Sequence, residues 1–195
     1  MKLRTTLLFG SPGAGKGTQG AILGNIPGYL HISSGDLFRN LGAQNPLRET
    51  FIEYAGRGEL VPDEPTIGLV REDIDNRIRN GNFEPETDTL LLDGIPRNLA
   101  QAQLLDDTLN VVGVLNLFCT DIDIMVERLQ ARALRENRLD DANLETILNR
   151  LEVHKAETRP VLDHYGEDIS YTIDSTQSPV RVLRDVLEVL AKLEM

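Results

Sequence analysis

The chain has 195 residues, of which 41% are hydrophobic and 26% charged, and a formal net charge of −11; this indicates one folded domain with a substantial core and excludes a disordered chain. Its single cysteine, Cys119, excludes a disulfide framework and a cysteine-based zinc site. The chain contains no run of about 18 apolar residues, which argues against a membrane span. Because affinity for nucleic acid depends on basic side chains, the acidity of the chain argues against a nucleic-acid partner. From the lone cysteine and the lack of an apolar span we expect a cytoplasmic protein without membrane contact.

Short apolar runs alternate with helical patterns along the chain. The first run, residues 4–9, is rich in β-forming residues and ends at Gly10; it is too short for a secretory signal, so we expect a buried strand. Further strands are expected at residues 29–32, 89–92, 111–118 and 169–173. Helical patterns cover residues 16–23, 47–54, 64–78, 99–105, 122–134, 143–165 and 180–193.

This alternation of strands and helices predicts an α/β fold with a central parallel sheet of five strands, covered by helices on both faces. In such sheets ligands bind beyond the carboxyl ends of the strands. Polar or glycine-rich segments accompany the first three strand ends: GSPGAGKGTQ, ISSGD and DGIPR. We therefore expect these segments to meet along one edge of the sheet, and no repeat or linker divides the chain.

The segment GSPGAGKGTQ nearly fits the phosphate-binding pattern G-x-x-x-x-G-K-[ST]. Gly10, Gly15 and Lys16 match, whereas Gly17 takes the hydroxyl position and Thr18 follows one place later. Such glycines let backbone N–H groups turn inward to bind an anion, and Lys16 adds a positive charge for the β- and γ-phosphates. A plain glycine-rich turn is the alternative, but the order of strand, loop and helix favours a phosphate site.

Two further strand ends carry polar residues. Ser33 or Ser34 is placed to cap a helix, and Asp93 stands where phosphate-loop enzymes often hold Mg²⁺, directly or through water. Either segment alone is equally consistent with a helix cap or a turn. Their combination with the glycine loop favours a nucleotide site.

A cluster of arginines occupies one short region of this acidic chain: Arg128, Arg132, Arg135 and Arg138. The first three share one face of a helix by their spacing, and Arg150 follows them. A solvated helix face is the usual explanation of such a run, but local arginines in an acidic chain favour bidentate phosphate contacts. Asp140 and Asp141 are placed to hold some of these guanidinium groups.

The sequence gives little support to nucleophilic or metal-ligand chemistry by other residues. His31, His154 and His164 form neither a triad nor a metal-ligand spacing, so we expect structural roles for all three. No base is placed to activate a serine as a nucleophile. For Cys119 we expect the role of a small buried hydrophobe.

Together these segments resemble adenylate kinases, within the nucleoside monophosphate kinase family. The resemblance extends over nearly the whole chain through GSPGAGKGTQ, ISSGDLFR, GELVPDE, DGIPRNLAQAQ, ERLQAR, NRLDD and NRLEVHKAETRPVLDHY. It implies a P-loop three-layer sandwich in which a CORE, within residues 1–195, carries an NMP-binding insert at residues 33–62 and a LID at residues 131–141. Only residues 133–137 separate Arg132 from Arg138, which implies the short-LID form without room for a zinc site.

The resemblance also implies the substrates ATP and AMP, the cofactor Mg²⁺ and the residues that bind them. ATP is expected to contact Gly13, Ala14, Gly15, Lys16, Gly17, Thr18, Arg128, Arg132 and Gln177. AMP is expected to contact Ser34, Arg39, Glu59, Leu60, Val61, Gly94, Arg97, Gln101, Arg138 and Arg150. The expected catalytic side chains are Lys16, Arg97, Arg132, Arg138 and Arg150. Mg²⁺ is expected to be bound more by water and Asp93 than by the hydroxyl of Thr18, because Gly17 displaces that hydroxyl by one position.

The implied reaction is reversible phosphoryl transfer, ATP + AMP ⇌ 2 ADP, carried out by a monomer. One alternative is a UMP/CMP-type kinase, against which Gln101 argues because its amide can both donate to and accept from adenine. The other is a nucleotide-dependent switch or ATPase, which would leave Arg39, Arg97 and Arg150 without a role.

Three positions depart from the family's pattern. Ser34 replaces the usual threonine but keeps the hydroxyl, and Ile95 replaces the aromatic residue of the DG(F/Y)PR motif. One extra residue lies between Asp141 and Arg150. The extra residue bears on the register of Arg150, which the three-dimensional structure has to settle.

Overall fold

The computed structural model describes residues 2–136, 138–141 and 143–194. Residues 1 and 195, at the ends of the expected CORE, and Asn137, within the expected LID at residues 131–141, lie outside the described residues. None of the described helices is long and apolar enough to cross a membrane.

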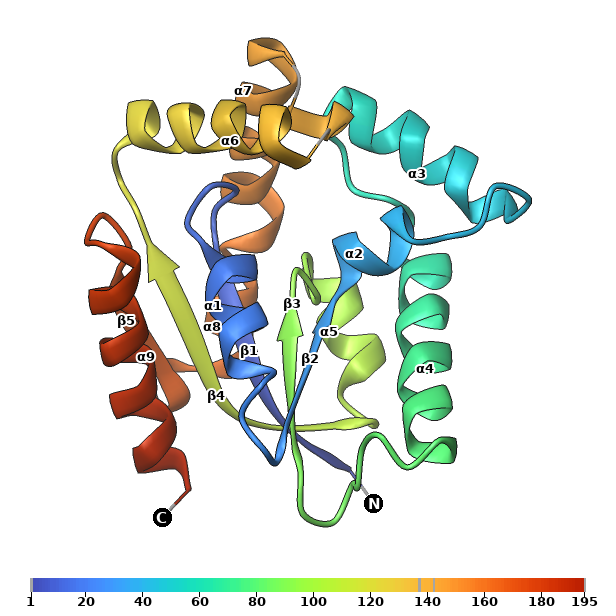
Figure 1. The fold of residues 1–195 in the computed structure, drawn as a ribbon, viewed down its shortest axis with the longest axis vertical. Helices are drawn as coiled ribbons and strands as arrows, with labels where there is room; N and C mark the ends of the chain where they lie inside the picture. Colours follow the sequence, from blue (N-terminus) through green and yellow to red (C-terminus); the bar gives the residue numbers. More distant parts are fainter. Residues whose placement is uncertain (1, 137, 142, 195) are drawn as a thin grey trace.

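A parallel sheet of five strands forms the centre of the molecule, in the order β2-β3-β1-β4-β5 (Figure 1). The strands are β1 (Leu3–Gly10), β2 (Tyr29–Ser33), β3 (Thr89–Asp93), β4 (Leu109–Phe118) and β5 (Ser170–Asp174). Each lies within one or two residues of an expected strand, so the predicted five-stranded parallel sheet is confirmed.

The central parts of the strands are buried because apolar residues there point alternately to the two faces of the sheet. In β1, Leu7 joins the core on one face of the sheet together with Leu92, and Leu8 joins the core on the other face together with Leu91 and Leu115. These strand residues are 0–1% exposed. Both faces of the central part of the sheet are therefore shielded from solvent.

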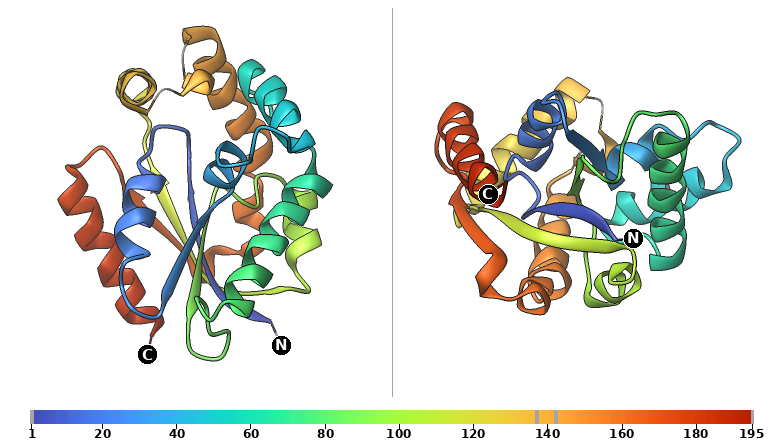
Figure 2. Two further views of the ribbon diagram at one scale, coloured as in Figure 1. Left: turned by 45° about the vertical axis from the view of Figure 1, so that its right-hand side comes forward. Right: turned by 90° about the horizontal axis from the view of Figure 1, so that it is seen from below.

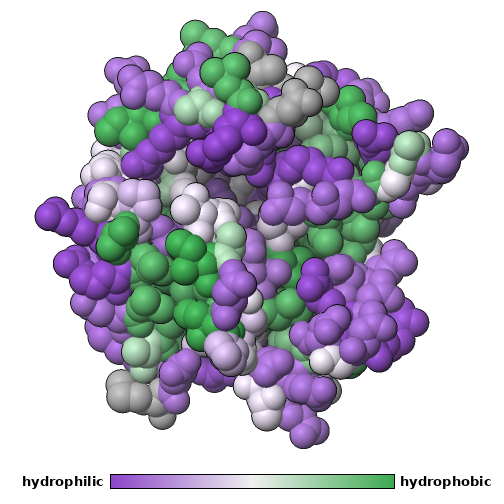
Figure 3. Space-filling model, viewed as in Figure 1, coloured by the Kyte–Doolittle hydropathy of each residue, from purple (hydrophilic) through white to green (hydrophobic). Residues whose placement is uncertain are grey.

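Helices cover both faces of the sheet and complete three layers, as Figure 2 shows. On one face lie α1 (Lys16–Leu23) and α9 (Pro179–Leu193); on the other lie α4 (Asp63–Arg79), α5 (Leu99–Leu105) and α8 (Val161–Tyr165). Figure 3 shows an apolar area over α1 and α9, whereas hydrophilic side chains dominate the upper part of the same face.

The remaining helices lie beyond the carboxyl ends of the strands (Figure 1). They are α2 (Ser34–Arg39), α3 (Pro46–Arg57), α6 (Ile122–Glu136), the 3₁₀ turn η1 (Leu139–Asp141) and α7 (Leu144–Val153). The end of α3 is fastened to α7, because Thr146 donates to the carbonyl of Gly56 at 3.1 Å and Asn149 donates to the carbonyl of Arg57 at 2.6 Å. A second 3₁₀ turn, η3 (Glu167–Ile169), precedes β5.

Side-chain caps fix where several helices begin. The hydroxyl of Ser33 accepts from the N–H of Asp36 at the start of α2, which settles the cap in favour of Ser33 over Ser34. Asn45, Asn98 and Asn143 cap α3, α5 and α7 in the same way.

The single helix expected at residues 143–165 is wrong. The structure divides this segment into α7, a π-helical turn (η2, His154–Thr158) and α8. The N–H of Arg159 bonds to the carbonyl of His154 at 3.0 Å, five residues back. Pro160 explains the break, because it has no N–H to donate and its ring displaces the carbonyl four residues earlier.

Candidate active site

A cavity of about 740 Å³ opens at the carboxyl edge of the sheet. Its walls come from the glycine loop after β1, the start of α2, the end of β3, the inner face of α6 and the inner face of α7. Every residue expected to bind ATP, AMP or Mg²⁺ lines this cavity. The structure thus brings together side chains that are spread over most of the sequence.

The glycine loop between β1 and α1 adopts backbone angles that favour glycine. Gly13 and Gly15 have φ values of 84° and 95°. A Cβ on Gly13 would lie 2.9 Å from the carbonyl oxygen of Met125, so the loop can lie this close to α6 only with glycine there. The glycine loop and the start of α1 line the cavity, which is where an anion site of this kind would lie.

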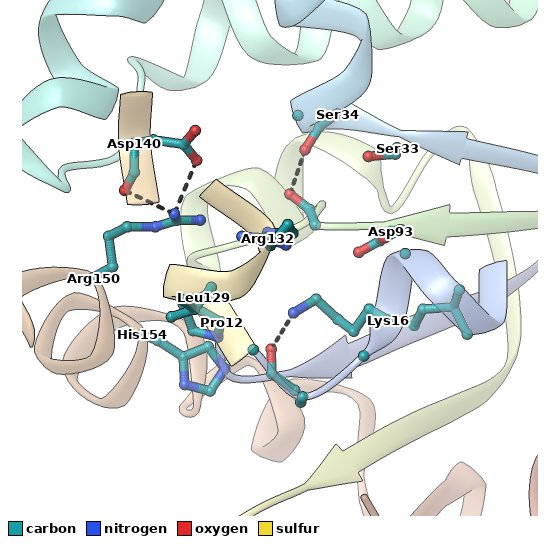
Figure 4. Close-up of a pocket in the computed structure, with 18 of the residues that line it drawn as sticks. Pro12, Lys16, Ser33, Ser34, Asp93, Leu129, Arg132, Asp140, Arg150 and His154 are labelled. Atoms are coloured by element: carbon teal, nitrogen blue, oxygen red, sulfur yellow. Dashed lines mark hydrogen bonds and ion pairs between the residues drawn. The ribbon is translucent and has the colours of Figure 1, made fainter. Parts of the chain in front are cut away.

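Lys16 folds back over the loop that precedes it. Its Nζ donates to the carbonyl oxygen of Gly10 at 2.6 Å (Figure 4) and to that of Ser11 at 3.1 Å. Burial is the main cause that lowers the pKa of Lys16 to about 8; Asp93 acts in the opposite direction, and the charge of Arg97 adds to the lowering. The ammonium group thus lies inside the cavity with little solvation, and a bound anion would stabilise its charged form.

Asp93 ends β3 beside the glycine loop and is 6% exposed. A Cβ on Gly17 would lie 3.7 Å from its Oδ2, so glycine leaves the first turn of α1 open towards this carboxylate. Nε2 of His31 lies 3.8 Å from the same oxygen. Among the described residues, no three histidine, cysteine or acidic side chains form a ready metal cluster, so a cation here would need oxygens from a ligand or water.

Gly94 and its neighbours form the wall opposite the glycine loop. The carbonyl of Gly94 accepts from the hydroxyl of Ser34 and from Nε of Arg97, both at 2.7 Å. Gly94 has a φ of 72°, and a Cβ there would lie 3.0 Å from Ser34 Oγ and from Arg97. Burial, followed by the charge of Arg150, lowers the pKa of Arg97 to about 10, which leaves it protonated at neutral pH.

Gln101 is 1% exposed, and both ends of its side-chain amide are bonded. Its Oε1 accepts from the backbone N–H of Arg97 at 2.8 Å, and its Nε2 donates to Oδ1 of Asp63 at 2.8 Å. The same carboxylate oxygen accepts from Nδ2 of Asn98 at 2.9 Å. Sequence reasoning missed Asp63, because an acidic residue in the first turn of a helix is common and carries no motif.

Two acidic residues of η1 hold two of the arginines. Arg150 donates to Asp140 at 2.9 Å (Figure 4). Arg132 donates to Asp141 at 2.7 Å, and Arg150 also donates to Asp141. Burial opposes ionisation of Asp140, but Arg150 and nearby arginines hold its pKa below the usual range. The expected role of both aspartates is confirmed, and Arg150 faces the cavity despite the extra residue in the sequence before it.

Arg138 and Arg39 approach the cavity from opposite elements. Arg138 follows α6 and bonds Glu136 at 2.7 Å, and it lies 3.7 Å from Asp36 on α2. Arg39, at the end of α2, bonds the same Asp36 at 2.6 Å. Asp36 therefore links the two sides of the cavity mouth. Arg135, at the rim, pairs with Glu136 and its side chain is 72% exposed.

The last expected residues lie at the two flanks. On one flank, Arg128 donates to the carbonyl of Ser175 at 2.9 Å, and Gln177 donates to Asp185 at 2.7 Å. On the other flank, the segment between α3 and α4 supplies three lining residues: Glu59, Leu60 and Val61. Two of the departures from the family pattern are accommodated, because Ser34 keeps its hydroxyl bond and Ile95 is 1% exposed in the core.

Sequence reasoning missed His154 as a cavity residue. It begins the π-helical turn and lies beside Pro12 and Leu129 in Figure 4. Its Nε2 is buried and has no hydrogen-bond partner among the described residues. Burial, together with the charges of Lys16 and Arg97, lowers the pKa of His154 to about 3. No sequence pattern marks this position, because the turn that aims the ring depends on Pro160.

This pKa makes His154 a source of acid sensitivity. In the unfolded chain histidine binds a proton below a pKa of about 6.5, whereas the native protein resists protonation down to about 3. The unfolded state binds more protons in this window, so stability falls as the pH falls. His154→Phe should reduce the loss of unfolding free energy between pH 7 and pH 5 by about 2 kcal/mol, measured by urea titration. Equal losses of unfolding free energy in the wild type and in His154→Phe would contradict the low pKa of His154.

Comparison with known proteins agrees with this geometry. Residues 8–170 match a sequence model of a family described as adenylate kinase. An adenylate kinase of Corynebacterium aurimucosum is 42% identical over 169 residues, which cover 84% of this chain and 86% of the relative. One from Synechococcus sp. is 42% identical over 165 residues, covering 82% of this chain and 81% of the relative, and one from Cyanothece sp. is 37% identical over 195 residues, covering 96% and 95%.

Proposed function

The chain belongs to the adenylate kinase family, and from this premise we propose how its cavity performs the reaction. It is a nucleoside monophosphate kinase, which transfers a phosphoryl group reversibly from ATP to AMP and gives two ADP. The observation that carries the assignment of sites is that one cavity contains two cationic regions on opposite walls. The glycine loop with Lys16 is one, and Arg97 with its neighbours is the other. A switch or ATPase would need only the first.

The wall of the glycine loop is proposed to bind ATP. Backbone N–H groups of Gly13 to Thr18 would hold its phosphates, with Lys16 between the β- and γ-phosphates. Arg128 and Gln177, on the adjoining flank, would contact the adenine end, and Arg132 would close over the phosphates. A phosphate that binds Arg132 competes with Asp141, its partner in the structure.

The opposite wall is proposed to bind AMP. Its phosphate would contact Arg39, Arg97, Arg138 and Arg150, and the last two would bridge to the transferring group. Its base would lie against Ser34, the segment of residues 59–61, Gly94 and Gln101. This arrangement places the acceptor phosphate and the donor phosphates at the same centre, between Lys16 and the arginines.

Mg²⁺ is the proposed cofactor, and the side chains present fit it. Hard oxygen ligands are what Mg²⁺ prefers, and it usually keeps several waters. Asp93 supplies a carboxylate beside the open first turn of α1, and Thr18 a hydroxyl on that turn. We propose that Asp93 binds through water and that Thr18 contributes less. Bound Mg²⁺ neutralises phosphate charge; the protein's own side chains set the geometry of the phosphates.

Catalysis by these residues needs positioning and charge stabilisation, and no covalent intermediate. Phosphoryl transfer spreads negative charge over the transferred oxygens, which Lys16, Arg132 and Arg150 are placed to stabilise. Water must be kept out, because it would otherwise accept the phosphoryl group. We propose that the LID at residues 131–141 and the NMP-binding insert at residues 33–62 close over the CORE for this purpose. Asp36 and Arg138, which lie 3.7 Å apart, belong to these two segments.

An acceptor assay tests the proposed substrate. ATP and Mg²⁺ are offered with AMP, CMP, UMP or dTMP, and ADP formation is followed by a coupled enzyme assay. AMP should give the highest kcat/KM, because the Gln101 amide matches adenine. ADP from CMP or UMP but not from AMP would contradict the assignment of the AMP site.

We further propose that the enzyme acts as a cytoplasmic monomer.

A further inference from the structure

Asp63 lies behind the proposed base site and outside the main cavity. It is the first residue of α4, and its Oδ1 accepts two side-chain hydrogen bonds, from Asn98 at 2.9 Å and from Gln101 at 2.8 Å. Asn98 is itself fixed, because its Oδ1 accepts from the N–H of Gln101 at 2.8 Å as the cap of α5. Asp63, Asn98 and Gln101 therefore form a closed ring of hydrogen bonds.

This ring determines which way round the Gln101 amide lies. A backbone N–H can only donate, so the atom that faces Arg97 N must be the amide oxygen. An ionised carboxylate can only accept, so the atom that faces Asp63 must be the amide nitrogen. Reversing the amide would oppose two donors at one end and two acceptors at the other. Because the residue is 1% exposed, little water is available to compensate for that mismatch.

The fixed amide leaves a definite pattern for a substrate. Each end of the amide has one hydrogen-bonding capacity left after these contacts: a lone pair on Oε1 and an N–H on Nε2. Adenine presents a 6-amino donor beside the N1 acceptor, which complements this pair. A 6-oxo purine presents an acceptor at position 6 and a donor at N1, which opposes it at both atoms.

We propose that Asp63 is a positioning residue that selects 6-amino over 6-oxo purine monophosphates by fixing the orientation of the Gln101 amide. This inference rests on the proposed function, in which the base of AMP lies against Gln101. Asp63 acts through Gln101 and does not itself contact the substrate. In the alternative explanation, Asp63 only stabilises the start of α4 by its charge, and its loss weakens all acceptors equally.

The test compares acceptors that differ only at the base. Asp63→Asn keeps the size of the side chain but replaces an obligate acceptor with an amide that can also donate, so of the two contacts that fix the Gln101 amide only the N–H of Arg97 still opposes its reversal. Asp63→Ala removes the acceptor altogether. Glu64→Gln is the matched control, because this substitution removes the same charge from the same turn of α4, at a residue that is exposed. For each protein, kcat/KM is measured with AMP, IMP and GMP at saturating ATP, and thermal midpoints are recorded.

In Asp63→Asn, the AMP/IMP ratio of kcat/KM should fall about tenfold or more, through a loss for AMP and a gain for IMP. Asp63→Ala should lower the same ratio by a smaller factor, and KM for ATP should stay within about twofold of wild type in both variants. Glu64→Gln should keep the wild-type ratio. Equal losses for AMP and IMP, or the same change of ratio in Glu64→Gln, would overturn the role of Asp63.

The outcomes for the wild-type enzyme separate this inference from the proposed function. If the wild type does not phosphorylate AMP, the assignment of the AMP site fails and the inference fails with it. If the wild type prefers AMP and the Asp63 variants keep its AMP/IMP ratio, the proposed function stands and the inference alone is overturned.

Discussion

Lys16→Met should lower kcat about 10²- to 10³-fold, the usual effect of removing one donor from a charge-stabilising site. The ammonium group of Lys16 lies inside the cavity and, among the described residues, donates to two carbonyl oxygens of its own loop, those of Gly10 and Ser11. In the proposed binding mode, the ammonium group lies close to the transferred phosphoryl group, where negative charge develops. Methionine has a similar length and no charge, so it removes the electrostatic contribution and leaves most of the packing.

The measurement is steady-state ADP formation with ATP, AMP and Mg²⁺, and Lys192→Met, on the exposed end of α9, is the control. The pH dependence supplies a second readout. The pKa of Lys16 is about 8, so above that pH ATP binding must take up a proton, and affinity should fall by up to about tenfold per pH unit. Lys16→Met should lose this component of the pH profile. Activity of Lys16→Met within about threefold of wild type would contradict the role of the loop lysine.

Arg97→Ala should lower kcat/KM for AMP by about 10- to 150-fold, which corresponds to the loss of a charge-assisted hydrogen bond worth about 1.5–3 kcal/mol. Arg97 is fixed by its own bond to the carbonyl of Gly94, and its pKa of about 10 keeps it charged at neutral pH. Because it stands on the wall opposite the glycine loop, the loss should fall on AMP and spare ATP.

Separate titrations of each substrate measure this asymmetry. KM for AMP should rise strongly, and KM for ATP should stay within about twofold. Arg79→Ala, at the exposed end of α4, removes an arginine far from the cavity and should behave as wild type. An equal rise in both KM values would place Arg97 outside the acceptor wall.

The sequence predicts those parts of the fold that depend on local patterns. Apolar runs identify all five strands, because a parallel sheet buried on both faces needs continuous apolar residues. The glycine loop is predicted for a similar reason, since its backbone angles and its close approach to Met125 demand glycine at fixed spacing. The broken helix after α7 shows the limit of periodicity, because apolar spacing continues across Pro160 although the hydrogen bonds do not.

The residues that sequence reasoning missed act through contacts between distant elements. Asp63 becomes informative only when the start of α4 meets Gln101 of α5, 38 residues further along the chain. His154 becomes a cavity residue only because a π-helical turn follows it and aims its ring at the loop after β1. Neither arrangement has a signature in residue spacing, whereas the phosphate-binding residues do.

The pairing of arginines with the aspartates of η1 has a consequence for selectivity among anions. Arg132 and Arg150 are paired with Asp140 and Asp141 within the protein, so a nucleotide bound as proposed would exchange one anionic partner of these arginines for another. Few ions are released to solution in such an exchange, so nucleotide affinity should depend less on ionic strength than it does for an exposed basic surface. A small anion such as chloride or sulfate gains little by displacing a carboxylate that is already in contact. A nucleotide, with several phosphates and a base bound at once, gains enough to do so.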